Sequence, residues 1–560
     1  MLKENKLRTK RYAIGLDFGT QSVRSAIIDI NNGEEVFASI YKYKSGVIDA
    51  ILPDNDVKLP LDSALQDPRD YEDGLIYTIK RILNNTKVNK RDIIGLGIDF
   101  TSCTMMPIKS DSTPLCFIEK FRSDPNSWVK LWKHHSAHEY ALRLNEIAIK
   151  RGEDFLDRYG GKISSEWMIP KIMQIADESP KIYDEADYMI EGGDWIVQRL
   201  TGNLTRNISC LGYKAIWDGN FPSKDFFKEL DPKLENVHDK LSGKILKLGE
   251  LAGYLNSDYQ KKLNLPQLPV AVANIDAHVA VPATTVVEPG KMVMIMGTST
   301  CHMVLWDRFT KVTGVGGIVK DGIISGYWGY EAGQASAGDA FEWFIRNSVP
   351  YAYFKEAKNK NISTFNYLTG LASKLKPGES GILCMDWLNG NRSILMDADL
   401  SGLVLGIKLS TKPEEIYRAI IEATAFGTRK IIEAFENSGI KIESLFTCGG
   451  LAQKNEITMQ IYSDVTGREI NIAKSIQTGC LGSAMHAAVA AGYYRDIKEA
   501  AKYMSHLKNK KFIPDKDNVI IYNKLYEQYL RLHDYFGLPE NSEMKTLIEI
   551  RKEIKKVFRH

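Results

Sequence analysis

Two short segments, one near the N-terminus and one just past the middle of the chain, share an apolar run that ends in Gly-Thr and small polar residues. The first spans Ala13–Ser22 and the second spans Met292–Thr300. We expect each run to be a β-strand and each Gly-Thr pair a tight turn after it. Such a turn points backbone N–H groups at one place, and glycine lets an anion approach closely. Two such turns facing each other would hold a triphosphate.

The residues of these turns are the first candidates for nucleotide binding. One Gly-Thr turn alone would more often be a plain hairpin, and it is the pair that favours a phosphate site. Asp17 precedes the first turn, and a carboxylate beside phosphates commonly holds Mg²⁺ through its water shell. A Walker loop is excluded, because Gly290-Lys291-Met292 lacks the leading glycine and the hydroxyl residue. The predicted phosphate contacts are Gly19, Thr20, Gln21, Ser22, Gly297, Thr298 and Ser299.

The size of the chain predicts more than one domain. A length of 560 residues exceeds what one hydrophobic core usually serves, so we expect two large domains with a cleft between them. The charge balance is close to even, with 73 basic and 70 acidic residues and a formal charge of +3. Neither a nucleic-acid partner nor an anionic membrane is indicated by this composition.

Targeting and metal signals are weak in this sequence. Met1–Arg11 lacks the apolar stretch of a signal peptide and no later window reaches 18 apolar residues, so we expect a cytoplasmic protein. The seven cysteines show no C-x-x-C spacing, which indicates neither a disulfide framework nor a zinc site. His134, His135 and His138 lack clustered Cys or carboxylate partners, and a solvated helix face is the favoured interpretation.

Hydrophobic periodicity indicates an α/β fold. Strand patterns alternate with helical patterns in both halves, and loops after strands carry the candidate residues. The predicted strands are 12–18, 22–30, 35–43, 93–100, 266–273, 445–448 and 469–472. The predicted helical stretches are 70–83, 125–151, 170–202, 335–347, 413–437, 454–465 and 482–491, followed by helices in the last 40 residues.

Three motifs together resemble a known family. Gly15–Thr20, Met296–Thr300 and Thr447–Ala452 are similar to the two phosphate motifs and the adenosine motif of the actin-like ATPase fold, in the version used by FGGY carbohydrate kinases. The resemblance runs from about Tyr12 to Tyr494. It implies a two-domain, ribonuclease H-like fold that uses ATP and Mg²⁺ in the cleft. For the rest of the nucleotide, it implies contacts from Gln334, Gly338, Gly449, Gly450, Gln453 and Asn455.

The resemblance also predicts the domain organisation. We expect a sugar-binding domain over residues 1–275 and a nucleotide-binding domain over residues 276–515. Residues 516–560 are then a C-terminal helical extension.

Within the family, the chain is most similar to the L-ribulokinases. The blocks that carry this likeness are 97–104, 131–135, 192–195, 212–217, 275–278 and 330–334. They imply phosphorylation of a ketopentose by MgATP, here L-ribulose to L-ribulose 5-phosphate, a step of arabinose catabolism. Asp276 matches the family's catalytic base, which takes the proton of the attacking sugar hydroxyl. Lys214 and Glu331 resemble residues that hold sugar hydroxyls, and Thr101 and Ser102 are expected to add contacts.

Other functions stay open at this point. A kinase of another pentose or pentitol, such as D-ribulose, ribitol or xylulose, would show the same motifs. A different class is an actin-like ATP-driven binding protein, against which Asp276, Lys214 and Glu331 argue; a sugar-responsive regulator lacks a recognisable DNA-binding helix pair. Many sugar kinases carry W-x-D-x-R, whereas this chain has Trp132-Lys133-His134-His135-Ser136, so contacts from that motif are not carried over. The expected partners are the sugar and ATP, and a homodimer is left open.

Overall fold

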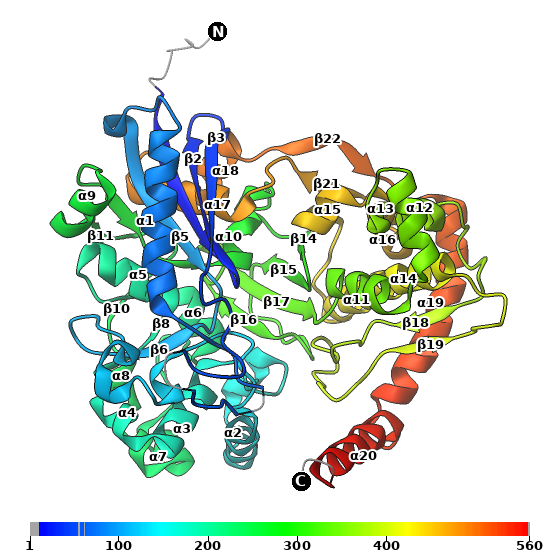
Figure 1. Ribbon diagram of the computed structural model, residues 1–560, viewed down its shortest axis with the longest axis horizontal. Coiled ribbons are helices and arrows are strands. Elements are labelled where there is room, and N and C mark those ends of the chain that lie inside the picture. Colours follow the sequence, from blue (N-terminus) through cyan, green and yellow to red (C-terminus); the bar gives the residue numbers. More distant parts are fainter. Residues whose placement is uncertain (1–9, 54–55, 61, 558–560) are drawn as a thin grey trace.

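The computed structural model describes residues 10–53, 56–60 and 62–557. Met1–Thr9, most of the segment read above for targeting, lie outside the described residues. Figure 1 shows two lobes side by side, with the N-terminal half on one side and the C-terminal half on the other. Across the described residues, no helix combines the length and apolar character needed to cross a membrane.

The N-terminal lobe is built on a mixed sheet with the strand order β11-β12-β5-β1-β2-β3. Strands β1 to β3 form the predicted antiparallel meander, and β5 runs parallel to β1. Strand β13 pairs with the end of β5. The strands are β1 Tyr12–Phe18, β2 Ser22–Asp29, β3 Glu35–Lys42, β5 Ile93–Phe100, β11 Leu251–Tyr254, β12 Pro269–Ala271 and β13 Asn274–Ile275.

The C-terminal lobe repeats this arrangement. Its sheet has the order β16-β17-β15-β14-β20-β21-β22, with β14, β15 and β17 antiparallel and β20 parallel to β14. The two lobes therefore share a meander followed by parallel strands, and each Gly-Thr turn joins the first two strands of its meander. The strands are β14 Lys291–Met296, β15 Thr300–Trp306, β16 Gly317–Lys320, β17 Trp328–Gln334, β20 Ser444–Cys448, β21 Ile470–Ala473 and β22 Leu507–Phe512.

Helices α2, α3, α4, α7 and α8 belong to a subdomain below the main sheet (Figure 1). A smaller sheet in the order β4-β7-β6-β8 lies between them and the main sheet. Its strands are β4 Leu65–Gln66, β6 Met105–Ile108, β7 Val129–Lys130 and β8 Tyr188–Glu191, and β9 Thr205–Asn207 pairs with β10 Lys244–Leu246. The helices of this half are α1 Pro68–Asn84, α2 His138–Arg151, α3 Met168–Glu178, α4 Pro180–Glu185, α5 Gly192–Thr201, α6 Ile208–Lys214, α7 Lys224–Leu230, α8 Val237–Lys240, α9 Ser257–Leu263 and α10 Asp276–Ala283.

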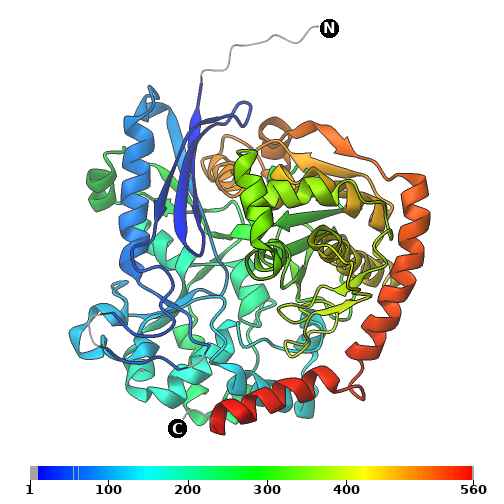
Figure 2. The same cartoon turned by 45° about the vertical axis from the view of Figure 1, so that its right-hand side comes forward.

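Helices also surround the C-terminal sheet, and the amphipathic helix α14 spans the predicted residues. Helix α19 buries Tyr522, Tyr526 and Tyr529 against this lobe. Figure 2 shows α19 along one edge of the lobe and α20 turning away along the lower edge of the molecule. The remaining elements are α11 Gly338–Ser348, α12 Tyr351–Asn359, α13 Thr364–Ala372, β18 Leu383–Met385, β19 Leu403–Leu405, α14 Pro413–Asn437, α15 Gly450–Lys454, α16 Glu456–Thr466, α17 Thr478–Ala490, α18 Ile497–Met504, α19 Lys516–Gly537 and α20 Glu543–Val557.

Two helical predictions were wrong in part. Within 125–151, residues Val129–Lys130 form β7, which pairs with β4 and β6, and the helix begins only at His138. Within 170–202, Tyr188–Glu191 form β8 along the edge of β6. Strands this short contain too few residues to show a period of two, and their identity comes from the ladder they complete.

Glycines bring the two lobes together at their crossing. Helix α17 follows the C-terminal strands but packs on β1 and β5 of the other lobe, and it also contacts α10. A Cβ atom on Gly15 or Gly97 would lie 1.8 Å from a carbonyl oxygen of α17. A Cβ atom on Gly482 would lie 1.9 Å from the carbonyl oxygen of Val279 in α10. Only glycine fits at these positions without a shift of backbone.

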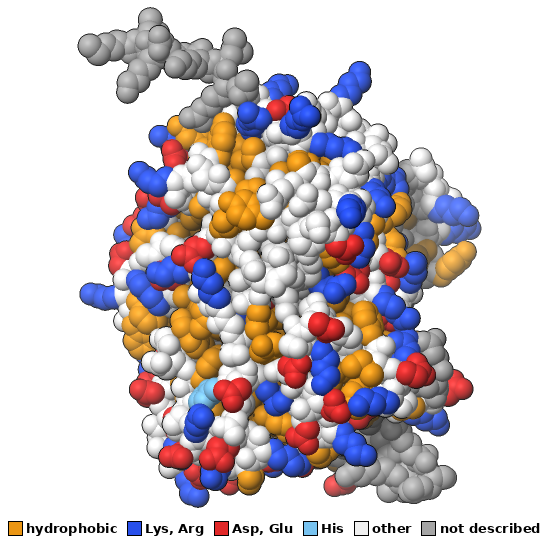
Figure 3. Space-filling view, turned by 90° about the vertical axis from the view of Figure 1, so that its left-hand side faces the viewer, with side chains coloured by type: hydrophobic (Ala, Val, Ile, Leu, Met, Phe, Trp, Pro, Cys, Tyr) orange, Lys and Arg blue, Asp and Glu red, His pale blue; other side chains and the backbone are white. Residues whose placement is uncertain are grey.

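The face of the molecule in Figure 3 carries basic and acidic side chains interspersed. No single-sign patch dominates this face, which agrees with the even charge balance.

The close contact between α17 and α10 at Gly482 predicts how a substitution there changes thermal stability. We expect Gly482→Ala to lower the midpoint of thermal unfolding, because overpacking against backbone costs about 1–3 kcal/mol. Gly370→Ala is the matched control, since Gly370 lies in α13 with open space at its Cβ position and alanine favours a helix. Equal midpoints for Gly482→Ala and the unmodified protein would contradict the contact.

Candidate active site

The first Gly-Thr turn is tight and held from two sides. The Gly19 N–H donates to the Ser22 carbonyl oxygen at 3.0 Å and closes the turn between β1 and β2. The Thr20 carbonyl oxygen accepts a hydrogen bond from Gln66 Nε2 at 2.7 Å, and the Thr20 side-chain hydroxyl accepts one from Trp132 Nε1 at 3.0 Å. Neither donor belongs to the meander, so the small sheet of this lobe fixes the position of the turn.

The second Gly-Thr turn lies against two further predicted residues. The Gly297 N–H donates to the Ser299 carbonyl oxygen at 2.9 Å, and Gly338 donates to the Gly297 carbonyl oxygen at 3.1 Å. Gly449 has a φ of +95°, and a Cβ atom there would lie 2.4 Å from the Met296 carbonyl oxygen. The predicted second phosphate turn, the start of α11 and the predicted adenosine loop are therefore in direct contact.

Three carboxylates meet where adjacent strands end. In the sheet register Asp17 pairs with Asp99, and Asp99 pairs with Asn274, two residues before Asp276. Burial and the charge of Asp17 raise the pKa of Asp99, whose Oδ2 accepts from the Ser483 hydroxyl at 2.6 Å. Its Oδ1 is buried without a hydrogen-bond partner among the described residues. Burial and the neighbouring Asp17 thus favour the protonated form of Asp99 beside the first turn.

Asp276 begins α10, at the point where the chain passes from one lobe to the other. Its Oδ1 accepts from the Ala277 N–H at 2.7 Å. Burial raises its pKa to about 7, with Asp17 contributing in the same direction. A carboxylate with such a pKa can take a proton from a hydroxyl at neutral pH and release it afterwards.

Lys214 and Glu331 form a buried ion pair across the lobes. Lys214 Nζ, at the end of α6, lies 2.9 and 3.1 Å from the two carboxylate oxygens of Glu331, which is on β17. Burial alone would lower the pKa of Lys214, but the adjacent Glu331 outweighs it and the pKa is raised. Burial alone would raise the pKa of Glu331, but Lys214 outweighs it and the pKa is lowered. Both groups are therefore charged at neutral pH.

His278 completes this cross-lobe network, and sequence reasoning gave it no role. Its Nε2 lies 3.0 Å from Glu331 Oε2, and because a carboxylate only accepts, this nitrogen carries the proton. Its Nδ1 lies 2.8 Å from the Ser209 hydroxyl of α6. Its place in the block 275–278, two residues after Asp276, was the signal in the sequence.

Trp132 and Arg392 were also missed as site residues. The Arg392 guanidinium lies 5.9 Å from the Trp132 ring centroid, and its Nη2 lies 3.7 Å from a Glu166 carboxylate oxygen. The Arg392 side chain also passes Gly333, where a Cβ atom would meet it at 3.2 Å. Trp132 thus contacts Thr20 from the N-terminal half and Arg392 from the C-terminal half. No motif surrounds Arg392 in the sequence, so only the fold brings it here.

The loop after β5 holds Thr101 and Ser102 at the end of the strand. The Thr101 hydroxyl is paired with the Thr104 hydroxyl at 2.8 Å, whereas Ser102 is partly exposed. Buried Lys171 donates to the carbonyl oxygens of Cys103 at 2.7 Å and Leu131 at 2.8 Å. Lys171 therefore ties this loop to the segment that carries Trp132.

The predicted adenine-side residues are not all available to a ligand. Gln334 Nε2 donates to Asp386 Oδ2 and to the Thr424 carbonyl oxygen, and its Oε1 accepts from Thr428. All of these bonds lie inside the core, so the side chain of Gln334 is not available to contact a nucleotide. Asn455 is buried and caps α16 through Oδ1, while Gln453 Nε2 donates to the Ala473 carbonyl oxygen at 2.8 Å. Gly450 faces open space.

A magnesium ion fits this site only through water. In the part of the chain that the structure describes, no group of three His, Cys, Asp or Glu side chains could hold a metal directly. The unpartnered Asp99 Oδ1 and the neighbouring Asp17 do provide oxygen acceptors for a hydrated cation. The Arg24 guanidinium forms an ion pair with Asp17, with Nη1 lying 3.3 Å from Oδ2.

Comparison with known proteins decides the family. The N-terminal domain of the FGGY family of carbohydrate kinases matches residues 12–282, and the C-terminal domain of that family matches residues 292–491. The chain belongs to the FGGY family of carbohydrate kinases. It is therefore an enzyme of the carbohydrate kinase class, which uses ATP, and the interpretation as an actin-like binding protein is not favoured.

Curated relatives and solved structures agree with this membership. This FGGY kinase is 53% identical over 548 residues to a ribulokinase of Anoxybacillus flavithermus, covering 96% of this chain and 97% of the relative. It is 51% identical to a ribulokinase of Halalkalibacterium halodurans, covering 96% and 97% of the two chains. Its fold matches a gluconate kinase of Lactobacillus acidophilus, with a TM-score of 0.77 at 17% identity over 95% and 99% of the chains. The predicted fold class is confirmed.

Proposed function

We propose that this FGGY kinase transfers the γ-phosphoryl group of ATP to the terminal hydroxyl of L-ribulose and forms L-ribulose 5-phosphate. The observation that carries the proposal is the 53% identity to a ribulokinase over 96% of the chain. The Lys214–Glu331 pair beside Asp276 supports it, because this is a polar, buried surface that a polyhydroxylated ligand can use. Cytoplasmic location, a homodimer and the domain boundaries at 275 and 515 stay predictions.

The two Gly-Thr turns would bind the phosphates. Backbone N–H groups of Gly19–Ser22 and Gly297–Ser299, with the hydroxyls of Thr20 and Thr298, supply donors for phosphate oxygens. Trp132 and Gln66 keep the first turn fixed before ATP arrives, which reduces the entropy lost on binding. Gly449 and Gly450 would face the ribose and base.

Magnesium would be held through water by Asp17, with Asp99 as a second acceptor in reach. When bound, the ion neutralises charge on the phosphates. Burial is the main cause of the high pKa of Asp276, and the negative charge of Asp17 raises it further.

Lys214 and Glu331 would select the sugar. Lys214 donates and Glu331 accepts, so hydroxyls of the right configuration can replace part of the ion pair with bonds to both groups. A wrong stereoisomer would leave a buried charge without its partner, which strongly disfavours binding. The two residues come from different lobes, so sugar binding also favours the closed arrangement in which the acceptor hydroxyl faces Asp276.

A panel of acceptors tests the proposed substrate. The value of kcat/KM, measured by ADP release, should be highest for L-ribulose in a panel that also contains D-ribulose, D-xylulose and ribitol. Buried polar recognition can separate such substrates by factors of about 10⁴. A higher kcat/KM with any other member would replace L-ribulose as the substrate while leaving the kinase class in place.

Removing the proposed base tests the mechanism. Asp276→Asn should lower kcat by at least about 10²-fold, because a positioned general base contributes about 10² to 10⁴-fold. The Kd values for ATP and L-ribulose should change little, since the amide keeps the size of the side chain. Asp225→Asn, at an exposed position in α7, is the control and should keep full activity. A fully active Asp276→Asn enzyme would remove Asp276 from the mechanism.

The raised pKa of Asp276 predicts a pH profile. Asp276 acts as a base only when deprotonated, and its pKa in the free enzyme is raised to about 7. We therefore expect kcat/KM to fall as the pH drops through about 7, which steady-state rates from pH 5.5 to 9 would show. A flat profile down to pH 5.5 would contradict the role of this group.

A further inference from the structure

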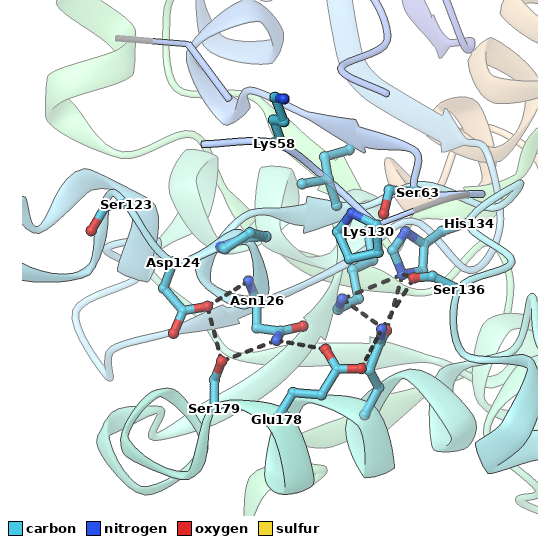
Figure 4. Close-up of a pocket in the computed structure, with 14 residues that line it drawn as sticks. Lys58, Ser63, Ser123, Asp124, Asn126, Lys130, His134, Ser136, Glu178 and Ser179 are labelled. Atoms are coloured by element: carbon cyan, nitrogen blue, oxygen red, sulfur yellow. Dashed lines mark hydrogen bonds between the residues drawn. The ribbon is translucent and has the colours of Figure 1, made fainter. Parts of the chain in front are cut away.

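A polar cavity lies in the N-terminal half, outside the predicted sugar and nucleotide sites. It has a volume of about 520 Å³ and is lined by the segment before β4, the turn 123–126, β7, and the end of α3. Figure 4 shows Lys130, His134 and Ser136 grouped at one end of it and Asp124, Asn126, Glu178 and Ser179 at the other. None of these residues has a part in the proposed reaction. The size suits a small metabolite.

Lys130 is a buried cation with few acceptors. The residue is 1% exposed, and its Nζ donates to Gln174 Oε1 at 3.0 Å. The His134 Nε2 atom lies 3.4 Å from the same Nζ. Because the Ala64 N–H donates to His134 Nδ1 at 3.1 Å, the proton of the neutral ring is on Nε2. His134 therefore cannot accept from Lys130.

The proton on His134 Nε2 has its own acceptors. It faces the Ser136 hydroxyl at 2.7 Å and Gln174 Oε1 at 3.0 Å. Burial and the neighbouring Lys130 lower the pKa of His134, so the ring is neutral. Among the described residues, the three N–H donors of Lys130 therefore have one acceptor, Gln174 Oε1, and His134 Nε2 shares that acceptor.

The carboxylates of the cavity do not compensate Lys130 by contact. Glu178 accepts from Gln174 Nε2 and Asn126 Nδ2, each at 3.1 Å. Asp124 Oδ1 accepts from the Asn126 N–H at 2.8 Å and the Ser179 hydroxyl at 2.9 Å. Burial lowers the pKa of Lys130 to about 7, although Glu178 and Asp124 act in the opposite direction. An uncompensated buried ammonium is costly, and an anion beside it would be favoured.

The two ends of the cavity therefore favour different chemical groups on a ligand. The Lys130 end offers unused donors and suits a carboxylate. The Asp124 and Glu178 end offers carboxylate oxygens with lone pairs left, which accept from hydroxyls. A small molecule that carries a carboxylate at one end and hydroxyls along its chain satisfies both ends. An inorganic anion would leave the acidic end unused and near its own charge.

The walls of this cavity continue directly into the first phosphate turn. Leu65 lines the cavity, and the next residue, Gln66, donates to the Thr20 carbonyl oxygen. Lys130 pairs with Leu65 between β7 and β4, and Trp132, two residues later, donates to the Thr20 hydroxyl. A ligand that holds β4 and β7 together would hold both donors to Thr20 in place.

We propose that this cavity binds a small hydroxycarboxylate, with its carboxylate on Lys130 and its hydroxyls toward Asp124 and Glu178, and that the bound ligand strengthens nucleotide binding at the Thr20 turn. The site is regulatory, because the ligand reacts with nothing. The inference does not depend on which sugar the enzyme phosphorylates.

Calorimetric titration with D-ribonate tests the site. Ribitol is the matched probe, since it keeps the hydroxyl chain and lacks the carboxylate. Titrations are run on the full chain and on Glu331→Gln, which impairs the sugar site and leaves the cavity intact. We expect D-ribonate to bind the unmodified chain and Glu331→Gln with equal Kd. Ribitol should bind Glu331→Gln at least about tenfold more weakly than D-ribonate does, since a hydrogen bond to a charged group contributes about 1.5–3 kcal/mol.

Lys130→Met is the decisive variant. Replacing a buried charge with an apolar side chain of similar shape is commonly tolerated, and retained ADP binding shows that the variant is folded. Its Kd for D-ribonate should rise at least about tenfold, because the charged hydrogen bond is lost. Lys150→Met, at an exposed site in α2, should bind D-ribonate like the unmodified chain. D-ribonate should lower the Kd for ADP in the unmodified chain and not in Lys130→Met.

Four results would overturn the proposal. D-ribonate binding that survives Lys130→Met would place the ligand elsewhere, and binding lost in Glu331→Gln would place it in the sugar site. Ribitol binding as tight as D-ribonate binding in Glu331→Gln would exclude the carboxylate contact. An unchanged Kd for ADP would exclude the link to the Thr20 turn.

Discussion

The close crossing of α17 over the N-terminal sheet is the contact on which the rest of the structure depends. Helix α17 belongs to the C-terminal half of the chain, yet its backbone rests on β1 and β5 where Gly15 and Gly97 leave no Cβ atom in the way. Helix α10 crosses in the other sense and contacts β14 and β15. The two lobes are therefore joined by exchanged helices that touch at Gly482.

The crossing also explains why acidic groups gather in one place. The Asp99 carboxylate accepts from Ser483 of α17, and a Cβ atom on Gly479 of the same helix would meet Asp17 at 3.0 Å. Asp276 starts α10 beside them. Removing these carboxylates from water disfavours their charged forms, which is the main cause of the raised pKa values of Asp99 and Asp276. The close packing of the two lobes and the raised pKa values of these carboxylates thus come from one arrangement.

Much of this fold could be predicted from the sequence, because local patterns and family motifs agree with it. The strand Tyr12–Phe18 and the helix Pro413–Asn437 have the predicted bounds. Strand β8 could not be predicted, since its four residues depend on pairing with β6. Gln334 was assigned to the nucleotide from its place in a motif, but the fold turns its amide into the core.

The candidate site was predictable where residues lie in motifs and not where folding alone assembles them. Asp276, Lys214 and Glu331 were named from sequence blocks, and the structure places Lys214 against Glu331. Arg392 sits in an irregular segment without a motif, and its approach to Trp132 joins residues far apart in the chain. The same limit applies to Lys130, whose burial follows from the short strand β7 inside a stretch read as helical.

The cross-lobe ion pair links specificity to catalysis. An ion pair buried between lobes has lost most of its hydration, so its energy depends on the groups that replace water. Lys214 and Glu331 neutralise each other when the sugar is absent, and His278 and Ser209 keep the glutamate oriented. In the proposed mechanism, a sugar that binds at this pair would have to offer hydroxyls that restore every bond it disturbs. Water alone offers no fixed array of hydroxyls, so in the proposed mechanism the sugar, rather than water, would hold both lobes in place beside Asp276.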